Sequence, residues 1–233
     1  MHKRFYKSVE FRALTANPDE HFEILLDDRI VLTPKKNKLK VRSKQIAILV
    51  VKEWKSQSEY VDPAKMPITR LLNSAIDVVG ENRETILDDI VKYAASDLLF
   101  YRADSPEGLL KLQSEVWEPL LMISEKELGH EFIRAKGINY VEQPCVPLKF
   151  LRENFSDKPD CSLAAIHLIT TLTGSALLSF LMSRGKISEE TAWLAAHLDE
   201  DWQNSQWGID PEAHMRRLNR ERDFNAASLI LKN

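Results

Sequence analysis

The stretch HFEILLDDRIVLTPKKNKLKVR, residues 21–42, decides the fold class of this chain. Its apolar and polar residues alternate, which is the pattern of strands with one buried face. Two turn sequences interrupt the alternation, one at Asp27-Asp28 and one from Pro34 to Asn37. With the alternating run before it, the stretch predicts a small antiparallel sheet, whose strands are Phe5–Phe11, His21–Asp27, Arg29–Thr33 and Lys38–Arg42.

The apolar period becomes helical after Ser43, a residue that favours helix N-caps. Ile46, Leu49 and Trp54 recur on one face, and the pattern fades near Gln57. Almost everything beyond is helical in pattern, so we predict an α+β protein. A small N-terminal antiparallel β domain, residues 1–45, precedes a mainly α-helical domain, residues 46–233. The boundary stays open, because the helix from Ser43 to Gln57 can pack with either part.

Prolines, glycines and capping residues mark the later helices. Pro67 stands in a first turn, and Gly80 is expected to end that helix. Ser105-Pro106-Glu107 opens a long helix that Pro119 is expected to kink and Gly129 to stop. A short extended piece, Ile138–Val141, is expected to add a strand to the N-terminal sheet. The remaining helices are predicted from Asp160 to Gly185, from Ser188 to Gly208, and from Asp210 to Leu231. The flat surface at Gly174-Ser175-Ala176 is expected to let a neighbouring helix approach closely.

The segment WLAAHLDEDWQNSQWGID, residues 193–210, concentrates three of the five tryptophans of the chain in a polar, acid-rich region. On a continuous helix, one apolar stripe suited to a core consists of Leu194, Leu198 and Trp202. A second stripe, of aromatic and acidic residues, consists of Trp193, Glu200 and Trp207. This second stripe indicates a binding surface, because tryptophan is enriched at interfaces. The alternative is that both stripes are buried between helices, with Glu200 in an internal salt bridge.

Composition describes an ordinary globular chain of 233 residues with a formal charge of −3 and a pI near 6.1. This charge gives no reason to expect nucleic acid or an anionic membrane as the main partner. The basic run from Lys35 to Lys44 is expected to be a solvated face or a protected sheet edge. The apolar run from Leu163 to Met182 contains His167 and several hydroxyl residues, which favours a buried helix over a membrane span. No secretory signal or long presequence is recognisable, so we expect a bacterial cytoplasmic protein or a processed product.

Motifs of catalytic chemistry are absent from the sequence. The seven glycines are too dispersed for a phosphate-binding loop, and the six histidines and two cysteines lack metal-site spacing. We therefore expect no cofactor and no metal. A hydrolase using the acidic cluster Asp199, Glu200 and Asp201 remains an alternative, although consecutive residues diverge on a helix. His167 is expected to be a satisfied core histidine. Asp77 and Asp97, on apolar helices, are expected to pair with an arginine such as Arg70 or Arg102.

Several segments together resemble one family. In the N-terminal half they are RFYKSVEF at 4–11, LLDDRIVLTP at 25–34, KEWKSQ at 52–57 and MPITRLLNSAIDVV at 66–79. In the C-terminal half they are YAASDLLFYRADSPEGLLKLQSEVWEPLL at 93–121, LTGSALLSFLMSRGKIS at 172–188 and AWLAAHLDEDWQNSQWGID at 192–210. These blocks are similar to those of the assembly chaperone for the α subunit of the F-type ATP synthase catalytic head, in the same order and over nearly the whole chain.

The resemblance implies a chaperone, found in mitochondria and α-proteobacteria, that binds the free α subunit and prevents its aggregation until it pairs with the β subunit. It implies no catalysis, and a fold in which a small α+β domain precedes an orthogonal helical bundle. The matching positions that carry function in the family are Asp199, Glu200, Trp202, Gln203, Trp207 and Gly208. Our hypothesis is that Glu200 pairs with a basic client residue while Trp193 or Trp207 packs beside it. Trp54 also matches, but its apolar face indicates a role in folding. We expect a monomer, and a general helical adaptor remains a further alternative.

Overall fold

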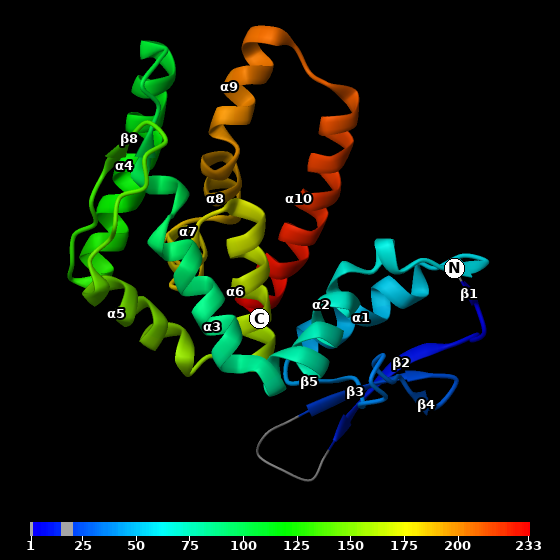
Figure 1. Ribbon diagram of the computed structural model, residues 1–233. Helices are drawn as coiled ribbons and strands as arrows, with labels where there is room; N and C mark the ends of the chain where they lie inside the picture. The colour runs from blue at the N-terminus through cyan, green and yellow to red at the C-terminus, as the bar shows by residue number, and fades with distance from the viewer. Residues whose placement is uncertain (1, 15–20) are drawn as a thin grey trace.

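The computed structural model describes residues 2–14 and 21–233 (Figure 1). Its N-terminal sheet contains β2 (Val9–Leu14), β3 (His21–Leu26), β4 (Arg29–Ile30) and β5 (Lys40–Val41). The strand β3 is central, because β2 pairs along one side of it while β4 and β5 pair along the other, all antiparallel. Asp27 and Asp28 form the predicted tight turn with φ angles of 45° and 65°, a left-handed conformation that aspartate tolerates. The antiparallel sheet is confirmed, with shorter strands than predicted.

Helix α1 (Lys44–Lys55) covers this sheet, and the predicted cap is present because Ser43 Oγ accepts a hydrogen bond from the Ile46 N–H. Its apolar face lies on β2 and β3, and it also contacts α2 (Pro67–Ser74). The helix therefore joins the sheet to the helical part, and the division at residue 45 stays a prediction. A second, two-stranded sheet pairs β1 (His2–Lys3) with β6 (Tyr60–Val61).

The helix that begins at Pro67 does not end at Gly80, so that prediction is wrong. A π-helical turn, Ala75–Val79, carries α2 directly into α3 (Gly80–Ala95), with a kink at Asn82. Gly80 has ordinary helical angles, φ −57° and ψ −37°, and so gives no stop. Asp77 in the π-helical turn accepts hydrogen bonds from the Thr33 hydroxyl and from the Lys35 backbone N–H.

The Asp77 carboxylate therefore ties the π-helical turn to the loop between β4 and β5, and the pairing expected with Arg70 does not occur. Arg70 instead pairs with Asp223 of the last helix, at 2.5 Å. Hydrogen bonding holds the pKa of Asp77 below its ordinary value, against the opposing effect of burial.

The remaining helices form an antiparallel and crossing bundle around α6 and α7 (Figure 1). Their bounds are α4 (Glu107–Leu128), α5 (Cys145–Ser156), α6 (Asp160–Thr173), α7 (Ala176–Ser183), α8 (Glu189–Ala196), α9 (Leu198–Trp207) and α10 (Pro211–Lys232). Gly129 ends α4 as predicted, with φ 71°. Pro119 lies inside α4, which the structure describes as one helix. Within the described ranges, no helix combines the length and the apolar character that crossing a membrane requires.

The extended piece expected at Ile138–Val141 does not form a strand. Instead, β7 (Tyr101–Arg102) pairs in parallel with β8 (Ala135–Lys136), and neither joins the N-terminal sheet. The alternation of a few residues could not show that this segment runs back along α4, far from the sheet (Figure 1).

The apolar helix predicted from Asp160 to Gly185 is broken at Gly174, whose φ of 69° ends α6. Ser175 then caps α7, so this site is a helix junction and not the flat surface expected there. The buried Asp97 carboxylate lies at this junction and accepts hydrogen bonds from the Ser175 hydroxyl and the Leu177 N–H, at 2.7 and 2.9 Å. Burial raises the pKa of Asp97 to about 6. The expected partnership of Asp97 with Arg102 is absent because backbone donors at the start of α7 take its place.

Candidate functional site

The tryptophan-rich segment forms two helices, α8 and α9, where the sequence predicts one. Ser188 caps α8 as expected, but the chain leaves helical geometry at His197, where φ is −111° and ψ is 14°. The His197 ring lies 3.9 Å from the Trp193 ring, and its Nδ1 is 2.9 Å from the Trp193 carbonyl oxygen. Burial lowers the pKa of His197. A single helical period across residues 193–207 therefore assigns some side chains to the wrong face, buried or exposed.

Trp193 and Leu194 exchange the roles predicted for them. The Trp193 side chain is 7% exposed and stacks on Phe224 of α10 at 4.9 Å, whereas Leu194 is 53% exposed. The core stripe through Leu194 is therefore wrong, and only Leu198 of that stripe is fully buried. Trp193 joins α8 to α10 inside the protein and offers no surface to a partner.

The three acidic residues at the start of α9 are directed to different neighbours. Asp199 accepts a hydrogen bond from the Gln113 amide of α4 at 2.8 Å. Asp201 forms a two-pronged ion pair with Arg217 of α10. Glu200 lies between them, has only a 3.9 Å contact to the Arg217 guanidinium, and its side chain is 36% exposed. Glu200 is therefore the least engaged carboxylate of the cluster.

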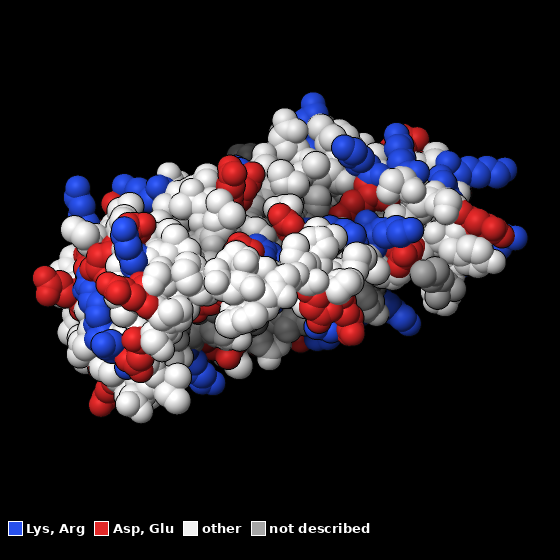
Figure 2. Space-filling model, turned by 90° about the horizontal axis from the view of Figure 1, so that it is seen from above, with Lys and Arg blue, Asp and Glu red and all other residues white. Residues whose placement is uncertain are grey.

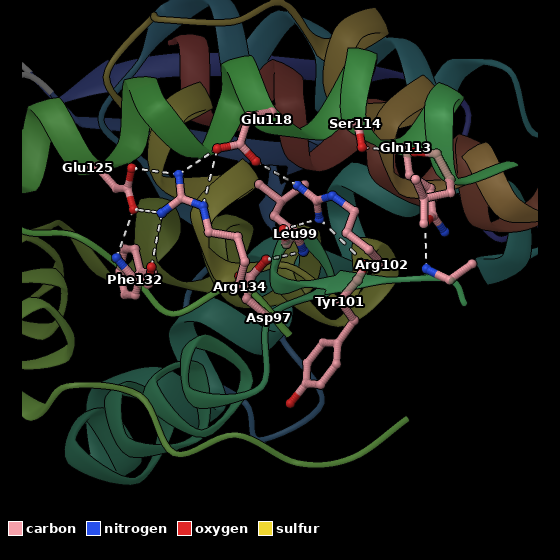
Figure 3. A network of polar contacts seen from close by, with 12 residues as sticks. Asp97, Leu99, Tyr101, Arg102, Gln113, Ser114, Glu118, Glu125, Phe132 and Arg134 are labelled. Carbon is pink, nitrogen blue, oxygen red and sulfur yellow. Dashed lines mark hydrogen bonds and ion pairs between the residues drawn. The ribbon is translucent and has the colours of Figure 1, made fainter. Parts of the chain in front are cut away.

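A polar network behind α4 fixes the position of Gln113 (Figure 3). The guanidinium groups of Arg102 and Arg134 approach Glu118 from two sides, at 3.2 and 2.6 Å. The hydrogen bond from Arg134 holds the pKa of Glu118 below its ordinary value, and burial lowers the pKa of Arg102. This network holds the chain after β7 against α4, where the Ala103 N–H donates to Gln113 at 2.7 Å. Gln113, itself 2% exposed, then holds Asp199 and with it the first turn of α9.

Trp202 packs α9 against the first turn of α4. The Cβ of any larger residue at Gly108 would lie 2.7 Å from the Trp202 ring, so the ring rests directly on the backbone there. On a helix Trp202 is rotated about 200° from Glu200, which places it on the inner side of α9. Trp202 therefore stabilises the site instead of forming its outer face.

The outer face of α9 contains Glu200, Gln203 and Trp207, which recur at i, i+3 and i+7 and so share one side of the helix. Gln203 is exposed, and Trp207 is 80% exposed at the end of α9, beside the capping residue Gly208 with φ 85°. We call these four residues the α9 face. They are the part of the predicted site that the structure brings to the surface.

Sequence reasoning missed the apolar residues that continue beyond Trp207. Ile209, Met215 and Leu218 are 63%, 57% and 40% exposed, in the link to α10 and on its first turns. Figure 2 views the molecule from the end where α9 meets α10 and shows a stretch without charged side chains between two charged regions. We call Trp207, Ile209, Met215 and Leu218 the α9–α10 tip. Exposed large apolar side chains at one end of a molecule are candidates for contact with a partner.

The arrangement does not resemble a hydrolytic centre. Asp199 and Asp201 are bound to α4 and α10, in directions about 200° apart around α9, so the carboxylates do not converge. Among residues 2–14 and 21–233, no group of three or more His, Cys, Asp or Glu side chains has the geometry to hold a metal ion. His167, expected to be a core residue, is partly exposed and lies 2.8 Å from Asp89.

Comparison with known proteins agrees with these observations. Protein atp12, mitochondrial, of Schizosaccharomyces pombe is 28% identical in an alignment 226 residues long, which covers 91% of this chain and 76% of that protein. The solved Atu1473 protein of Agrobacterium tumefaciens is 38% identical with a TM-score of 0.91, over 99% of this chain and 85% of that chain. Atp12 of Paracoccus denitrificans is 32% identical with a TM-score of 0.90, over 99% of this chain and 97% of that chain. Residues 3–125 match the family model described as ATP12 chaperone protein. The resemblance drawn from the sequence is confirmed, and the chain belongs to the ATP12 chaperone family.

Proposed function

We propose that this protein binds the unassembled α subunit of the F1 catalytic head and prevents its aggregation until the α subunit pairs with the β subunit. The α9 face and the α9–α10 tip form the contact, and the protein acts by binding, without catalysis. Family membership and the agreement of the sequence blocks with the assembly chaperone support this proposal. It acts as a monomer in the bacterial cytoplasm.

The observation that carries the proposal is the contrast between Glu200 and its neighbours. Asp199 and Asp201 are held by α4 and α10, whereas Glu200 has no hydrogen-bond partner among the described residues and shares its helix face with the exposed Trp207. An exposed tryptophan beside an available carboxylate is suited to an apolar client surface with a basic residue nearby.

A subunit of a ring exposes its apolar interface while it is alone, and this surface favours self-association. Covering it requires complementary area, roughly 800 Å² per partner for a standard interface. The true neighbour can then displace the chaperone by competition, which requires no chemical step. A rigid α9 suits this task, since Gln113, Arg217 and the Trp202 ring fix its orientation before the client binds.

Glu200→Lys tests the proposal, with Glu190→Lys as its control. Both carboxylates lie in the first turn of a helix, α9 and α8, and Glu190 is exposed without an ion pair among the described residues. The two variants therefore make the same charge change with a similar cost at the helix end. We expect Glu200→Lys to weaken co-purification of the α subunit at an unchanged melting temperature, while Glu190→Lys retains it.

The β subunit, added separately, is the specificity control. Equal capture of both subunits by the unmodified protein would favour a general helical adaptor. Equal capture of the α subunit by the two variants would contradict the role of Glu200.

A further inference from the structure

A cavity of about 600 Å³ lies between the N-terminal sheet and the helical bundle, away from the α9 face. Its floor is apolar, and contains residues of β5, α1, α2 and α10, among them Val41, Ile46, Leu72 and Ile230. Its rim is basic, because Lys38, Lys40, Arg42 and Lys158 line it. We call this cavity the sheet–bundle groove. Its volume is within the range of ligand sites.

The cations of the rim are largely without partners. Lys38, Arg42 and Lys158 form no ion pair with any described residue, and Lys40 is 3.9 Å from Glu23. The one carboxylate side chain of the rim, Asp160, is paired with Arg83 at 2.7 Å. The groove therefore presents a net positive rim above an apolar floor, and the complementary ligand is an anionic group attached to apolar ones.

The spacing of the cations indicates an extended ligand. Lys38, Lys40 and Arg42, in and on either side of β5, are exposed and alternate with the buried Leu39 and Val41. In extended chain this alternation directs the three cations to one side, about 7 Å apart. The strand β5 pairs with β3 alone among the described strands, so its other edge has no strand partner there. An extended peptide with acidic residues at alternate positions matches both features.

We propose that the sheet–bundle groove binds an extended segment of the client in which acidic side chains alternate with apolar ones. This inference rests on the proposed function, because it makes the segment part of the α subunit. It gives the protein two client contacts of opposite charge, an acidic one at the α9 face and a basic one here. Two separate contacts raise the overall affinity by effective concentration without enlarging either one.

The probe is a fluorescent peptide with glutamate at alternate positions and valine between, compared with a peptide that has lysine in place of glutamate. Binding to the full chain is measured by anisotropy. The groove variant is Lys38→Glu, Arg42→Glu and Lys158→Glu combined. Its charge-matched control is Lys92→Glu, Lys126→Glu and Lys136→Glu, three exposed lysines outside the groove without ion pairs among the described residues.

We expect the acidic peptide to bind the unmodified protein and the control, and to bind the groove variant at least roughly tenfold more weakly. The lysine peptide should not bind. If the groove variant unfolds, the neutral variant Lys38→Gln, Arg42→Gln and Lys158→Gln takes its place, with a smaller loss expected. Equal peptide affinity in the groove and control variants would overturn the inference. So would binding of vesicles that contain phosphatidylglycerol, without peptide binding.

Capture of the α subunit separates this inference from the proposed function. The groove variant should capture it more weakly, whereas Trp207→Ala should leave peptide affinity unchanged. Loss of peptide binding with full capture of the α subunit would show that the groove serves another ligand and would overturn the inference alone. Full capture by Trp207→Ala, with the groove results as expected, would contradict only the proposed α9–α10 tip. Self-association of the groove variant at unchanged peptide affinity would show that the cations protect a sheet edge, against the inference.

Discussion

Replacing Trp193 and Trp207 by alanine in two separate variants distinguishes a structural tryptophan from a binding one. Trp193 is 7% exposed and stacks on His197 and Phe224. Truncating a buried tryptophan costs about 3–5 kcal/mol of unfolding free energy, because transfer energy and packing are both lost. In a chain of this length the melting temperature should fall by about 10 °C.

Trp207 is 80% exposed, so its removal should change the free energy of unfolding by no more than about 0.5 kcal/mol. If Trp207 anchors the client, its loss should weaken binding by about 2 kcal/mol, or about 30-fold in affinity. The two variants are therefore expected to give opposite results in an assay of stability and an assay of client affinity. Trp193→Ala lowers stability strongly, and Trp207→Ala lowers client affinity at nearly constant stability.

Urea unfolding followed by circular dichroism measures the stability of each variant. Light scattering of the purified α subunit, titrated with each chaperone variant at a temperature where Trp193→Ala remains folded, measures client protection. Half-maximal protection should require about 30-fold more Trp207→Ala than unmodified protein. An unchanged titration for Trp207→Ala would refute the assignment of the α9–α10 tip. A stability loss below about 1 kcal/mol for Trp193→Ala would refute the account of its burial.

Three further predictions concern the elements that hold α9 and α7. Burial raises the pKa of Asp97 from 3.8 to about 6, so between these pH values the native state binds more protons than the unfolded state. The free energy of unfolding should therefore fall by about 3 kcal/mol as the pH rises through that window. Asp97→Asn should remove this pH dependence, and parallel pH profiles of unfolding free energy for the two proteins would contradict the prediction. Gln113→Ala should lower the free energy of unfolding, measured in urea, by about 1–3 kcal/mol, because the Ala103 N–H and the Asp199 carboxylate lose their hydrogen-bond partner. A loss no larger than that of a Gln→Ala change at an exposed site would contradict the role of the network. Gly108→Ala should shift the fluorescence emission of Trp202 and lower the free energy of unfolding by about 1 kcal/mol, because the clash at 2.7 Å outweighs the better helix propensity of alanine. A stabilised variant with unchanged emission would show that the ring moves freely.

Local chemistry was sufficient for many boundaries of this fold. The Asp27-Asp28 turn, the Ser43 cap of α1 and the Gly129 stop of α4 depend on a few adjacent residues, and each was predicted correctly. The antiparallel sheet and the change to helices followed from the apolar period in the same way. These features are readable because the interactions that fix them lie within one turn or one hairpin.

Residues 193–207 show what the helical period of apolar residues cannot predict. A repeat of 3.6 residues gives directions around one axis, and it gives no information on where that axis breaks. The chain breaks between α8 and α9 at His197, Trp193 is buried against α10, and Leu194 is exposed. The same limit applied at Gly80 and Gly174, where long-range hydrogen bonds to Asp77 and Asp97 accompany helix geometry that local rules did not predict.

The sequence by itself determined the fold class, the change from an N-terminal sheet to helices and, through its similar blocks, the family. Only the tertiary structure decided which carboxylates of the acidic segment are bound by other helices and which tryptophans are exposed. Asp199 and Asp201 are held by Gln113 and Arg217, residues far away in the sequence, and Glu200 is left available. Pairing and burial of these side chains depend on packing between separate helices, and no local pattern contains that information.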